Sequence, residues 1–467
     1  MITVNLDRDS STSLYIQLYE SLKRDIIIRK LLPNEALPSK RALSEHLGIS
    51  IKTIENAYSQ LLLEGYIYSV EKKGYYVNAL SDYRVRSNPT KPYVSKYTDE
   101  DYLVDLKANK NSMEMFPVST WYRIMRETLS YDTTRLWDTV PFNGLSELRI
   151  AIARHLLDFR GMEVSPDQII VGAGTEYLYA RLIQLLGRDT SFAVEDPGYT
   201  KIRAIYHSNQ VNYRAIPLDK NGIRIDLLKQ SDCNVVHVSP AHHFPLGLVM
   251  PIARRLELLS WVNAQKDRYI IEDDYDSEYR YHGMPVPPLY NIDVRSKVIY
   301  MNTFSKCIAP AVRISFMVLP EALMERYLST LSFYSCSVSS FDQFTLAKFI
   351  EGNYLERHIN HMKRYYIKQR DDVIRSISQS SLADKTRIIE DAAGTHFLLK
   401  VNTSLSDEEL ISRLKEKKIL ISCLSEYCEH KNPLYESTLI VNYSGITPGQ
   451  IRYFITELET LLQPYSA

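Results

Sequence analysis

The sequence predicts an α/β protein in which an N-terminal winged helix-turn-helix precedes a larger domain with a mostly parallel sheet, helices on both faces and a smaller C-terminal lobe. Three observations along the 467 residues support this prediction. Residues 1–80 combine helical apolar periodicity with a short hairpin. Residues 81–102 are mostly polar, lack periodicity and predict a linker. From residue 103 onward apolar strands alternate with helices, a pattern typical of a parallel sheet.

The first 80 residues predict their elements in the order of a winged helix-turn-helix. Leucines at helical spacing begin a first helix at Leu14, a second helix ends at Gly48, and Ser50 is placed as the N-cap of a third. The third helix stops at Glu64, and a hairpin with a basic tip follows at residues 66–77. The apolar stripe of the third helix consists of Ile54, Ala57, Tyr58, Leu61 and Leu62.

The third helix is the predicted recognition helix, which would place its N-terminal side chains in the major groove of double-stranded DNA. Residues 1–80 hold ten Lys or Arg and nine Asp or Glu, so a local patch and the pairing of two domains would have to supply affinity. A small helical interaction domain is the alternative. The predicted DNA-contacting residues are Ser50, Lys52, Thr53 and Asn56 on this helix, Ser39, Lys40 and Arg41 at the preceding helix, and Lys72 and Lys73 at the wing tip.

Composition limits the possible environments. Lys+Arg and Asp+Glu both number 56, so net charge indicates neither nucleic acid nor a membrane as partner. Five cysteines without metal-ligand spacing predict reduced thiols in a cytoplasm and no bound metal. No signal peptide opens the chain and no apolar run reaches about 18 residues. We therefore expect a soluble cytoplasmic protein.

The larger domain has four clear apolar strands. After about residue 320 the pattern changes to long helices with a few strands, which predicts a large part at about 103–320 and a smaller lobe at about 321–467. The four strands are Gln168–Gly172, Asn234–Val238, Tyr269–Ile271 and Val298–Met301.

Polar residues after the last two strands predict a pyridoxal 5'-phosphate (PLP) site. The Lys306 amine would condense with the PLP aldehyde, while Ser305 and Arg313, with the hydroxyl of Thr303, would hold its phosphate. Asp273 suits the pyridine nitrogen, which needs an anion, and Tyr275 suits the ring 3-oxygen. A surface lysine and an acidic turn are the alternatives, and each is common in isolation.

Both halves of the chain resemble one known family. The segment from Leu37-Pro38-Ser39-x-Arg41 to Glu64-Gly65-Tyr66 resembles the winged helix of GntR-type repressors, and residues from about 103 onward resemble a fold type I PLP-dependent aminotransferase. The fusion of the two is the pattern of MocR/GabR-type transcriptional regulators. The resemblance covers nearly the whole chain, and its two motif sets occur in the expected order.

The resemblance implies further roles in the cofactor site. Lys306 matches the Schiff-base lysine, and Tyr199 matches the aromatic residue that stacks on the pyridine ring. The segment 240–247 resembles the loop along the ring's edge, where His243 is a candidate neighbour and a structural role is equally open. The turn that meets the phosphate at a helix N-terminus corresponds to Gly174, Thr175 and Glu176.

Two positions depart from the family pattern. Ile440 stands where aminotransferases carry the arginine that grips the substrate α-carboxylate, although Lys201 is a candidate replacement. Ile51 stands where GntR-type proteins usually carry an arginine, and isoleucine cannot read guanine. The first departure counts against ordinary turnover of α-amino acids, and the second predicts an unusual operator.

These features predict a DNA-binding regulator whose aminotransferase-like domain senses PLP or a PLP–amine adduct, with vitamin B6 or amino acid metabolism as the regulated process. One alternative is a regulator of the same family that responds to an amine or amino acid, of the GABA or taurine type. Another is a working aminotransferase with a vestigial DNA-binding head, whereas we expect at most Schiff-base or half-transamination chemistry. The resemblance also implies a homodimer, with DNA-binding heads that cross over the partner.

Overall fold

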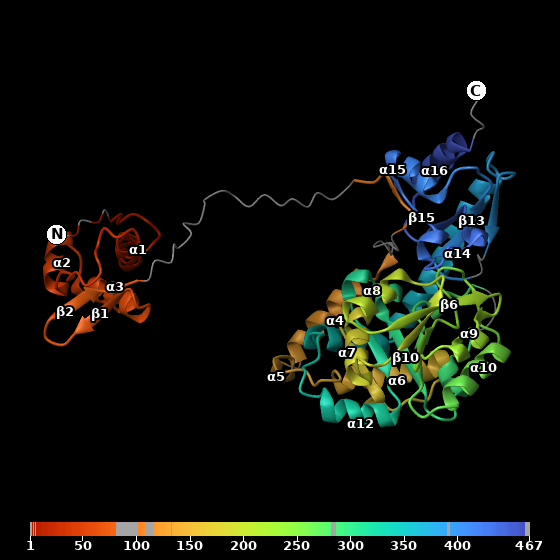
Figure 1. Ribbon diagram of the computed structural model, residues 1–467, viewed down its shortest axis with the longest axis horizontal. Helices are drawn as coiled ribbons and strands as arrows, with labels where there is room; N and C mark the ends of the chain where they lie inside the picture. Colours follow the sequence, from red (N-terminus) through yellow and green to blue (C-terminus); the bar gives the residue numbers. More distant parts are fainter. Residues whose placement is uncertain are drawn as a thin grey trace. The chain divides into compact units, whose positions relative to one another are not determined.

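The computed structural model describes residues 2, 4, 6–80, 101–107, 115–131, 133–281, 286–389 and 393–462. Most of the predicted linker, residues 81–100, lies outside the described residues. The chain divides into two compact units, residues 1–99 and 100–467 (Figure 1).

The first unit is a winged helix-turn-helix. The Ser39 hydroxyl accepts a hydrogen bond from the Ala42 amide and caps the second helix, which ends at Gly48 with a positive φ of 62°. Ser50 caps the third helix by accepting from the Thr53 amide at 3.1 Å, as predicted. The elements are α1 (Leu14–Ile27), α2 (Lys40–Leu47), α3 (Ile51–Leu63) and the antiparallel hairpin of β1 (Ile67–Val70) and β2 (Gly74–Val77).

The apolar stripe of α3 forms the core of this unit. Ile54, Tyr58 and Leu61 are fully buried and pack against Leu18 and Leu22 of α1. Burial of a large apolar side chain contributes about 1.5–3 kcal/mol, so these residues hold the three helices together. They leave the N-terminal turn of α3 exposed at its surface, where Ile51 and Lys52 lie.

The second unit is built on an eight-stranded sheet with the order β4-β11-β10-β9-β8-β5-β6-β7. The pairs from β10 through β9, β8 and β5 to β6 are parallel, while β11 and β7 run antiparallel to their neighbours, so the predicted mostly parallel sheet is confirmed. The strands are β4 (Ile169–Gly172), β5 (Phe192–Asp196), β6 (Tyr213–Asp219), β7 (Gly222–Ile223), β8 (Val235–Val238), β9 (Tyr269–Asp273), β10 (Val298–Thr303) and β11 (Ser315–Val318).

Helices cover both faces of this sheet. Adjacent residues of β4 point to opposite faces: Val171 packs in the cluster that contains Leu148 of α6, and Ile170 packs in the cluster that contains Leu182 of α7. Figure 1 shows α6 and α7 beside the strands of this sheet. The helices of the large part are α4 (Val118–Tyr131), α5 (Thr133–Leu136), α6 (Ser146–Arg160), α7 (Thr175–Leu186), α8 (Thr200–Ser208), α9 (Ile225–Gln230), α10 (Ile252–Asn263), α11 (Phe304–Cys307), α12 (Glu321–Thr330) and α13 (Ser340–Glu351).

A smaller C-terminal lobe is built on a four-stranded antiparallel sheet of order β12-β13-β16-β15, drawn in blue in Figure 1. Helices α12 and α13 still pack on α7 and α6, so the large part continues past residue 320. Near the start of this unit, β3 (Val104–Asp105) pairs with β14 (Ile419–Leu420) of the lobe. The other elements are α14 (Tyr354–Ser378), β12 (Thr386–Ile389), β13 (His396–Val401), α15 (Asp407–Glu416), β15 (Ser422–Cys423), β16 (Thr438–Asn442) and α16 (Pro448–Leu461).

Among the described helices, none combines the length and apolar character that crossing a membrane requires.

Candidate functional site

A cavity of about 530 Å³ opens at the carboxyl ends of β5, β8, β9 and β10. Ligands of open α/β sheets bind outside these strand ends, because loops from parallel strands converge there. Thr395 and His396 at the start of β13, with Asn442 at the end of β16, add walls from the C-terminal lobe. The cavity therefore lies between the two parts of the second unit.

Lys306 lies in the cavity wall, in the short helix α11 directly after β10. Its Nζ is 5.7 Å from the centroid of the Tyr275 ring. Burial lowers the pKa of the Lys306 amine, although Asp276 and Asp273 oppose this effect. A lowered pKa increases the neutral fraction of the amine, which is the form that attacks a carbonyl.

The two carboxylate oxygens of Asp273, at the end of β9, differ in their hydrogen bonding. Its Oδ2 accepts a hydrogen bond from the Tyr179 hydroxyl at 2.8 Å and lies 3.7 Å from Nε2 of His237. The other His237 nitrogen contacts the Tyr206 hydroxyl at 3.2 Å. Asp273 Oδ1 is buried and makes no hydrogen bond to any described residue. This oxygen is free to accept from a protonated ring nitrogen, which is the role predicted for it.

Sequence reasoning missed Tyr179, His237 and Tyr206, which orient Asp273. They come from α7, β8 and α8, so only the folded sheet brings them together. A histidine within the apolar run Val235–Val238 was the one available signal, because a buried imidazole requires polar partners.

The predicted phosphate-binding residues converge at the start of α7. Gly174 has a φ of +92°, and a Cβ there would overlap the Arg313 guanidinium, so glycine allows the arginine to approach the helix N-terminus. Ser305 Oγ is buried and has no partner among the described residues, which leaves it able to bind an anion. Thr303 lines the cavity, but its Oγ1 accepts from the Ser305 amide at 3.2 Å and from the Ser315 hydroxyl at 2.8 Å.

Glu176, in the first turn of α7, forms ion pairs with both Arg313 and Lys201. Burial alone would raise the pKa of the Glu176 carboxyl, but hydrogen bonds from Lys201 and Arg313 outweigh burial and lower it. The carboxylate is thus ionised at neutral pH. Lys201, the candidate replacement for the carboxylate-binding arginine, is thus paired with Glu176.

An aromatic wall forms another side of the cavity. The Tyr199 ring, predicted to stack on the pyridine, is 47% exposed and meets Phe244 edge to face at 5.8 Å between centroids. Phe244 also contacts Tyr427 at 5.3 Å and His396 at 5.1 Å. Tyr199 therefore remains accessible to a ligand in the cavity, and the rings of Phe244, Tyr427 and His396 form a wall next to it.

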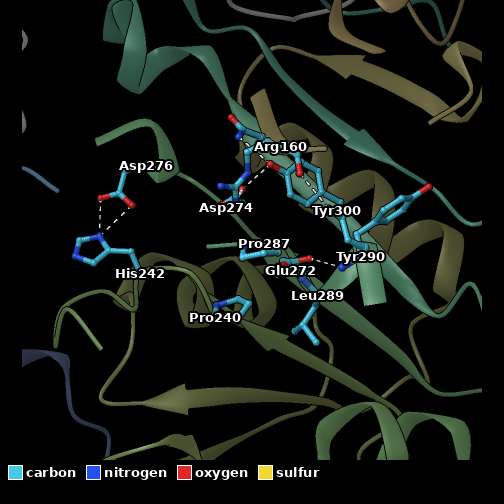
Figure 2. Close-up of polar contacts among 12 residues, drawn as sticks. Arg160, Pro240, His242, Glu272, Asp274, Asp276, Pro287, Leu289, Tyr290 and Tyr300 are labelled. Atoms are coloured by element: carbon cyan, nitrogen blue, oxygen red, sulfur yellow. Dashed lines mark hydrogen bonds and ion pairs between the residues drawn. The ribbon is translucent and has the colours of Figure 1, made fainter. Parts of the chain in front are cut away.

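The two histidines of the 240–247 loop, His242 and His243, have different surroundings. His242 Nδ1 lies 2.8 Å from Asp276 (Figure 2) and 3.3 Å from the Tyr275 hydroxyl. His243 is not among the described residues that line the cavity, because the loop turns back there through a hydrogen bond from the Gly247 amide to its carbonyl. Its ring lies 3.6 Å from Glu195, and burial lowers its pKa to about 3. His242 is thus the loop histidine closer to the predicted ring 3-oxygen donor.

Glu195, on β5, is a cavity residue that the sequence did not single out. Burial raises its pKa to about 8, a hydrogen bond from the Ser239 amide opposes this, and the Asp273 charge adds to it. At neutral pH the carboxyl is mostly protonated, so it adds little negative charge beside Asp273.

Alternation along β9 divides its polar end between two tasks. Asp273 and Tyr275 line the cavity, whereas Glu272 and Asp274 point to the other side, into the polar network of Figure 2. Asp274 accepts from Arg160 at 2.7 Å and from the Tyr300 hydroxyl at 2.6 Å, all buried. The Glu272 carboxylate accepts hydrogen bonds from the backbone amides of Leu289 and Tyr290. This network fixes the strand end that presents Asp273.

Ile440 is buried in an apolar cluster with Leu246, Leu398, Leu424 and Tyr427. The side chain predicted to stand in place of the carboxylate-gripping arginine is therefore packed against apolar aliphatic and aromatic groups. Asn442, two residues along β16, lines the cavity. Arg203 also lines it, but donates to the Tyr427 carbonyl at 3.1 Å and lies within 4 Å of Asp196 and Glu429.

The predicted DNA-contacting residues of the first unit all lie at its surface, half-buried at Lys40 and Thr53 and exposed elsewhere. Lys40 and Lys52 both pair with Glu55 of α3, each at 3.0 Å. The Ser50 hydroxyl contacts that of Thr53 at 2.8 Å. The recognition surface thus presents cations whose charge Glu55 partly neutralises.

Known proteins match both units. The family model of aminotransferase class I and II matches residues 102–458, and that of bacterial regulatory proteins of the gntR family matches residues 14–77. An aminotransferase class I and II domain implies PLP as its cofactor. In the solved structure of the multiple substrate aminotransferase from Thermococcus profundus, 92% of that chain matches 78% of this one, with 23% identity and a TM-score of 0.68, which shows the shared fold.

Relatives with both units cover nearly the whole chain. The HTH-type transcriptional regulator YdeL of Bacillus subtilis is 36% identical over 98% of each chain. The rhizopine catabolism regulatory protein MocR of Rhizobium meliloti is 30% identical over 97% of this chain and 95% of its own. The HTH-type pyridoxine biosynthesis transcriptional regulator PdxR of Corynebacterium glutamicum is 30% identical over 91% of each.

Proposed function

The chain belongs to the MocR-type transcriptional regulators, in which a GntR-family DNA-binding domain is fused to an aminotransferase-like domain, and on this basis we propose that it senses PLP. The observation that carries this proposal is the contrast within the cavity. Asp273 Oδ1 and Ser305 Oγ are unpaired among the described residues, whereas Ile440, which by resemblance stands where aminotransferases carry the carboxylate-gripping arginine, packs in an apolar cluster beside the cavity residue Tyr427. The site suits the cofactor better than an amino acid.

The residues present fit PLP. When bound, PLP supplies an aldehyde that condenses reversibly with an amine. Lys306, whose pKa is lowered, would provide the amine; Asp273 Oδ1 would accept the ring N–H; and Tyr275 would donate at the 3-oxygen. Arg313, Ser305 and the α7 N-terminus would hold the phosphate. The exposed side of Tyr199 would pack on the ring.

An amino-acid effector would meet a poor partner at Ile440. A charge-assisted hydrogen bond is worth about 1.5–3 kcal/mol, and an aliphatic side chain supplies none of it. PLP itself is therefore the proposed signal. The name of the relative PdxR refers to pyridoxine biosynthesis, which supports a regulated gene concerned with vitamin B6 supply.

For the regulatory step, PLP must bind two states of the protein with different affinity. We propose that it changes the spacing of two DNA-reading heads in a cytoplasmic homodimer, with heads that cross to the partner. Exposed apolar side chains support a dimer, among them Tyr122 on α4 and Trp137, which is 77% exposed. Sedimentation of the full chain as a monomer at micromolar concentration would contradict this part.

The experiment that tests the proposed function uses the purified full chain. We expect added PLP to produce the absorption band of lysine-bound PLP, and to change affinity for the chain's own promoter DNA. Lys306→Ala should lose both effects. DNA affinity unchanged by PLP, with a target unrelated to vitamin B6, would overturn the proposal.

The second candidate is a regulator that responds to an amine, supported by the aromatic wall of Phe244, Tyr427 and His396. This wall and the Ile440 cluster favour an amine without a carboxylate. Titrating carboxylate-free amines into the absorption band, and separately GABA and taurine, which carry an acid group, would identify the effector. Steady multiple turnover with amino donors and 2-oxo acids would instead identify a working aminotransferase.

A further inference from the structure

The carboxylate of Glu176 bridges the two cations at the start of α7, Lys201 and Arg313. We propose that Glu176 is a built-in competitor for the cofactor phosphate, which keeps PLP exchangeable and so makes it usable as a signal. This inference rests on the proposed function, since it concerns how tightly the same site holds PLP.

The position of the carboxylate supports competition. A Cβ placed on Gly174 would lie 3.1 Å from Glu176 Oε2 and would overlap the Arg313 guanidinium. The carboxylate and the guanidinium therefore share the concave surface that glycine creates. Ser305, another predicted phosphate ligand, lines the same cavity, and its hydroxyl has no partner among the residues that the structure describes. A phosphate that reaches Arg313 must share it with Glu176 or displace Glu176.

Charge determines the direction of the effect. A phosphate monoester carries about −1.5 to −2 at neutral pH, and Lys201 and Arg313 together carry two positive charges. With ionised Glu176 also present, the group has a net negative charge, so carboxylate and phosphate repel each other. Replacing Glu176 by glutamine removes one negative charge, so Lys201 and Arg313 can both attract the phosphate without competition from a carboxylate.

The size of the effect follows from exposure. The side chains of Glu176, Arg313 and Lys201 are 32%, 48% and 50% exposed, so solvent screens their interactions. Two ion pairs restrain Glu176, and an exposed ion pair changes an equilibrium constant by up to about fivefold. We therefore expect phosphate-bearing ligands to bind about tenfold more tightly to Glu176→Gln.

The test measures dissociation constants by fluorescence and absorbance for three ligands: PLP, pyridoxine 5'-phosphate, which lacks the aldehyde, and pyridoxal, which lacks the phosphate. Glu176→Gln should bind both phosphates about tenfold more tightly and pyridoxal unchanged. The matched control is Glu147→Gln: Glu147 lies in the first turn of α6, outside the cavity, and pairs with Arg135 of α5. It should behave as wild type with all three ligands.

Equal or weaker binding of both phosphates by Glu176→Gln would overturn the inference, because Glu176 would then be neutral or would position Arg313. A tightening shared by pyridoxal would also overturn it. If Glu176→Gln does not fold, Lys201→Gln offers a second measurement: it should weaken phosphate binding, since Glu176 would then hold Arg313 alone. Wild-type protein that binds no PLP at Lys306 would instead defeat the proposed function.

Discussion

The predicted phosphate-binding residues and the apolar cluster around Ile440 differ in what they offer an anion. At the phosphate end, Arg313, Lys201 and Ser305 stand beside a glycine turn, with Glu176 among them. Beside the cavity residue Tyr427, Ile440 packs in an apolar cluster, at the position where the resemblance predicts the carboxylate-gripping arginine of aminotransferases. The side chains predicted to bind the cofactor line the cavity, whereas the side chain predicted at the carboxylate position is apolar. This difference is the basis of the proposal that the domain is a receptor for the cofactor.

The largest expected effect comes from breaking the contrast at Ile440. Ile440→Arg would place a guanidinium among Leu246, Leu398 and Leu424, and a buried charge without a partner costs roughly 3–5 kcal/mol of the unfolding free energy. Denaturant unfolding followed by tryptophan fluorescence would measure it, because Trp121, Trp137 and Trp261 all lie in the second unit.

The control for this variant is Ile440→Met, which keeps an apolar side chain of similar volume and should cost less than about 1.5 kcal/mol. Addition of an amino acid should recover part of the loss in Ile440→Arg, since its carboxylate would pair with the new cation. A variant as stable as wild type would mean that Ile440 is not packed as the cluster indicates.

The second effect is at the ring end. Asp273→Asn keeps the side-chain shape but removes the charge offered to the ring nitrogen, so PLP affinity should fall about tenfold to a hundredfold, a loss of about 1.5–3 kcal/mol. Absorbance titration would measure it. Tyr179→Phe, which removes only the 2.8 Å hydrogen bond to Asp273, should lose less. If Asp273→Asn bound PLP as wild type does, the pyridine-nitrogen role would be wrong.

The third effect is a pH dependence centred on Glu195. Its pKa is raised to about 8 in the folded state, above the value of about 4.3 in an unfolded chain. Between these values the folded state binds more protons, so this group's contribution to stability is full below about pH 4 and is lost as pH rises toward 8. The loss is at most about 1.4 kcal/mol per pH unit.

Glu195→Gln should remove this contribution, so wild type should lose stability relative to the variant between pH 5 and 8. Glu272 and Glu278 have pKa values raised by burial to about 7 and about 8, and they add the same trend to both proteins. The difference between variant and wild type therefore isolates Glu195. Parallel stability curves across this range would contradict its raised pKa.

Local patterns predicted what depends on neighbours in sequence. Ser50 as N-cap, Gly48 as helix end and the β9 and β10 strands are confirmed, because caps and apolar runs act over a few residues. The hydrogen bond from Tyr179 to Asp273 was not predictable, since it joins α7 to β9 through the fold. Nor was the separate fate of His242 and His243, which depends on how one loop turns.

The smallest effect compares two neighbouring hydroxyls at the phosphate end. Ser305 Oγ makes no hydrogen bond to a described residue, so Ser305→Ala should leave the unfolding free energy unchanged while PLP affinity falls about fivefold, near 1 kcal/mol. Thr303→Val should lower the unfolding free energy and leave PLP affinity unchanged. The Thr303 Oγ1 already accepts hydrogen bonds from the Ser305 amide and the Ser315 hydroxyl, and losing them costs about 1 kcal/mol of stability or more. Thermal unfolding and PLP titration of both variants would measure the pair. If Ser305→Ala lost stability but not affinity, the open hydroxyl would be structural, and the phosphate end would rest on Arg313 and the α7 turn.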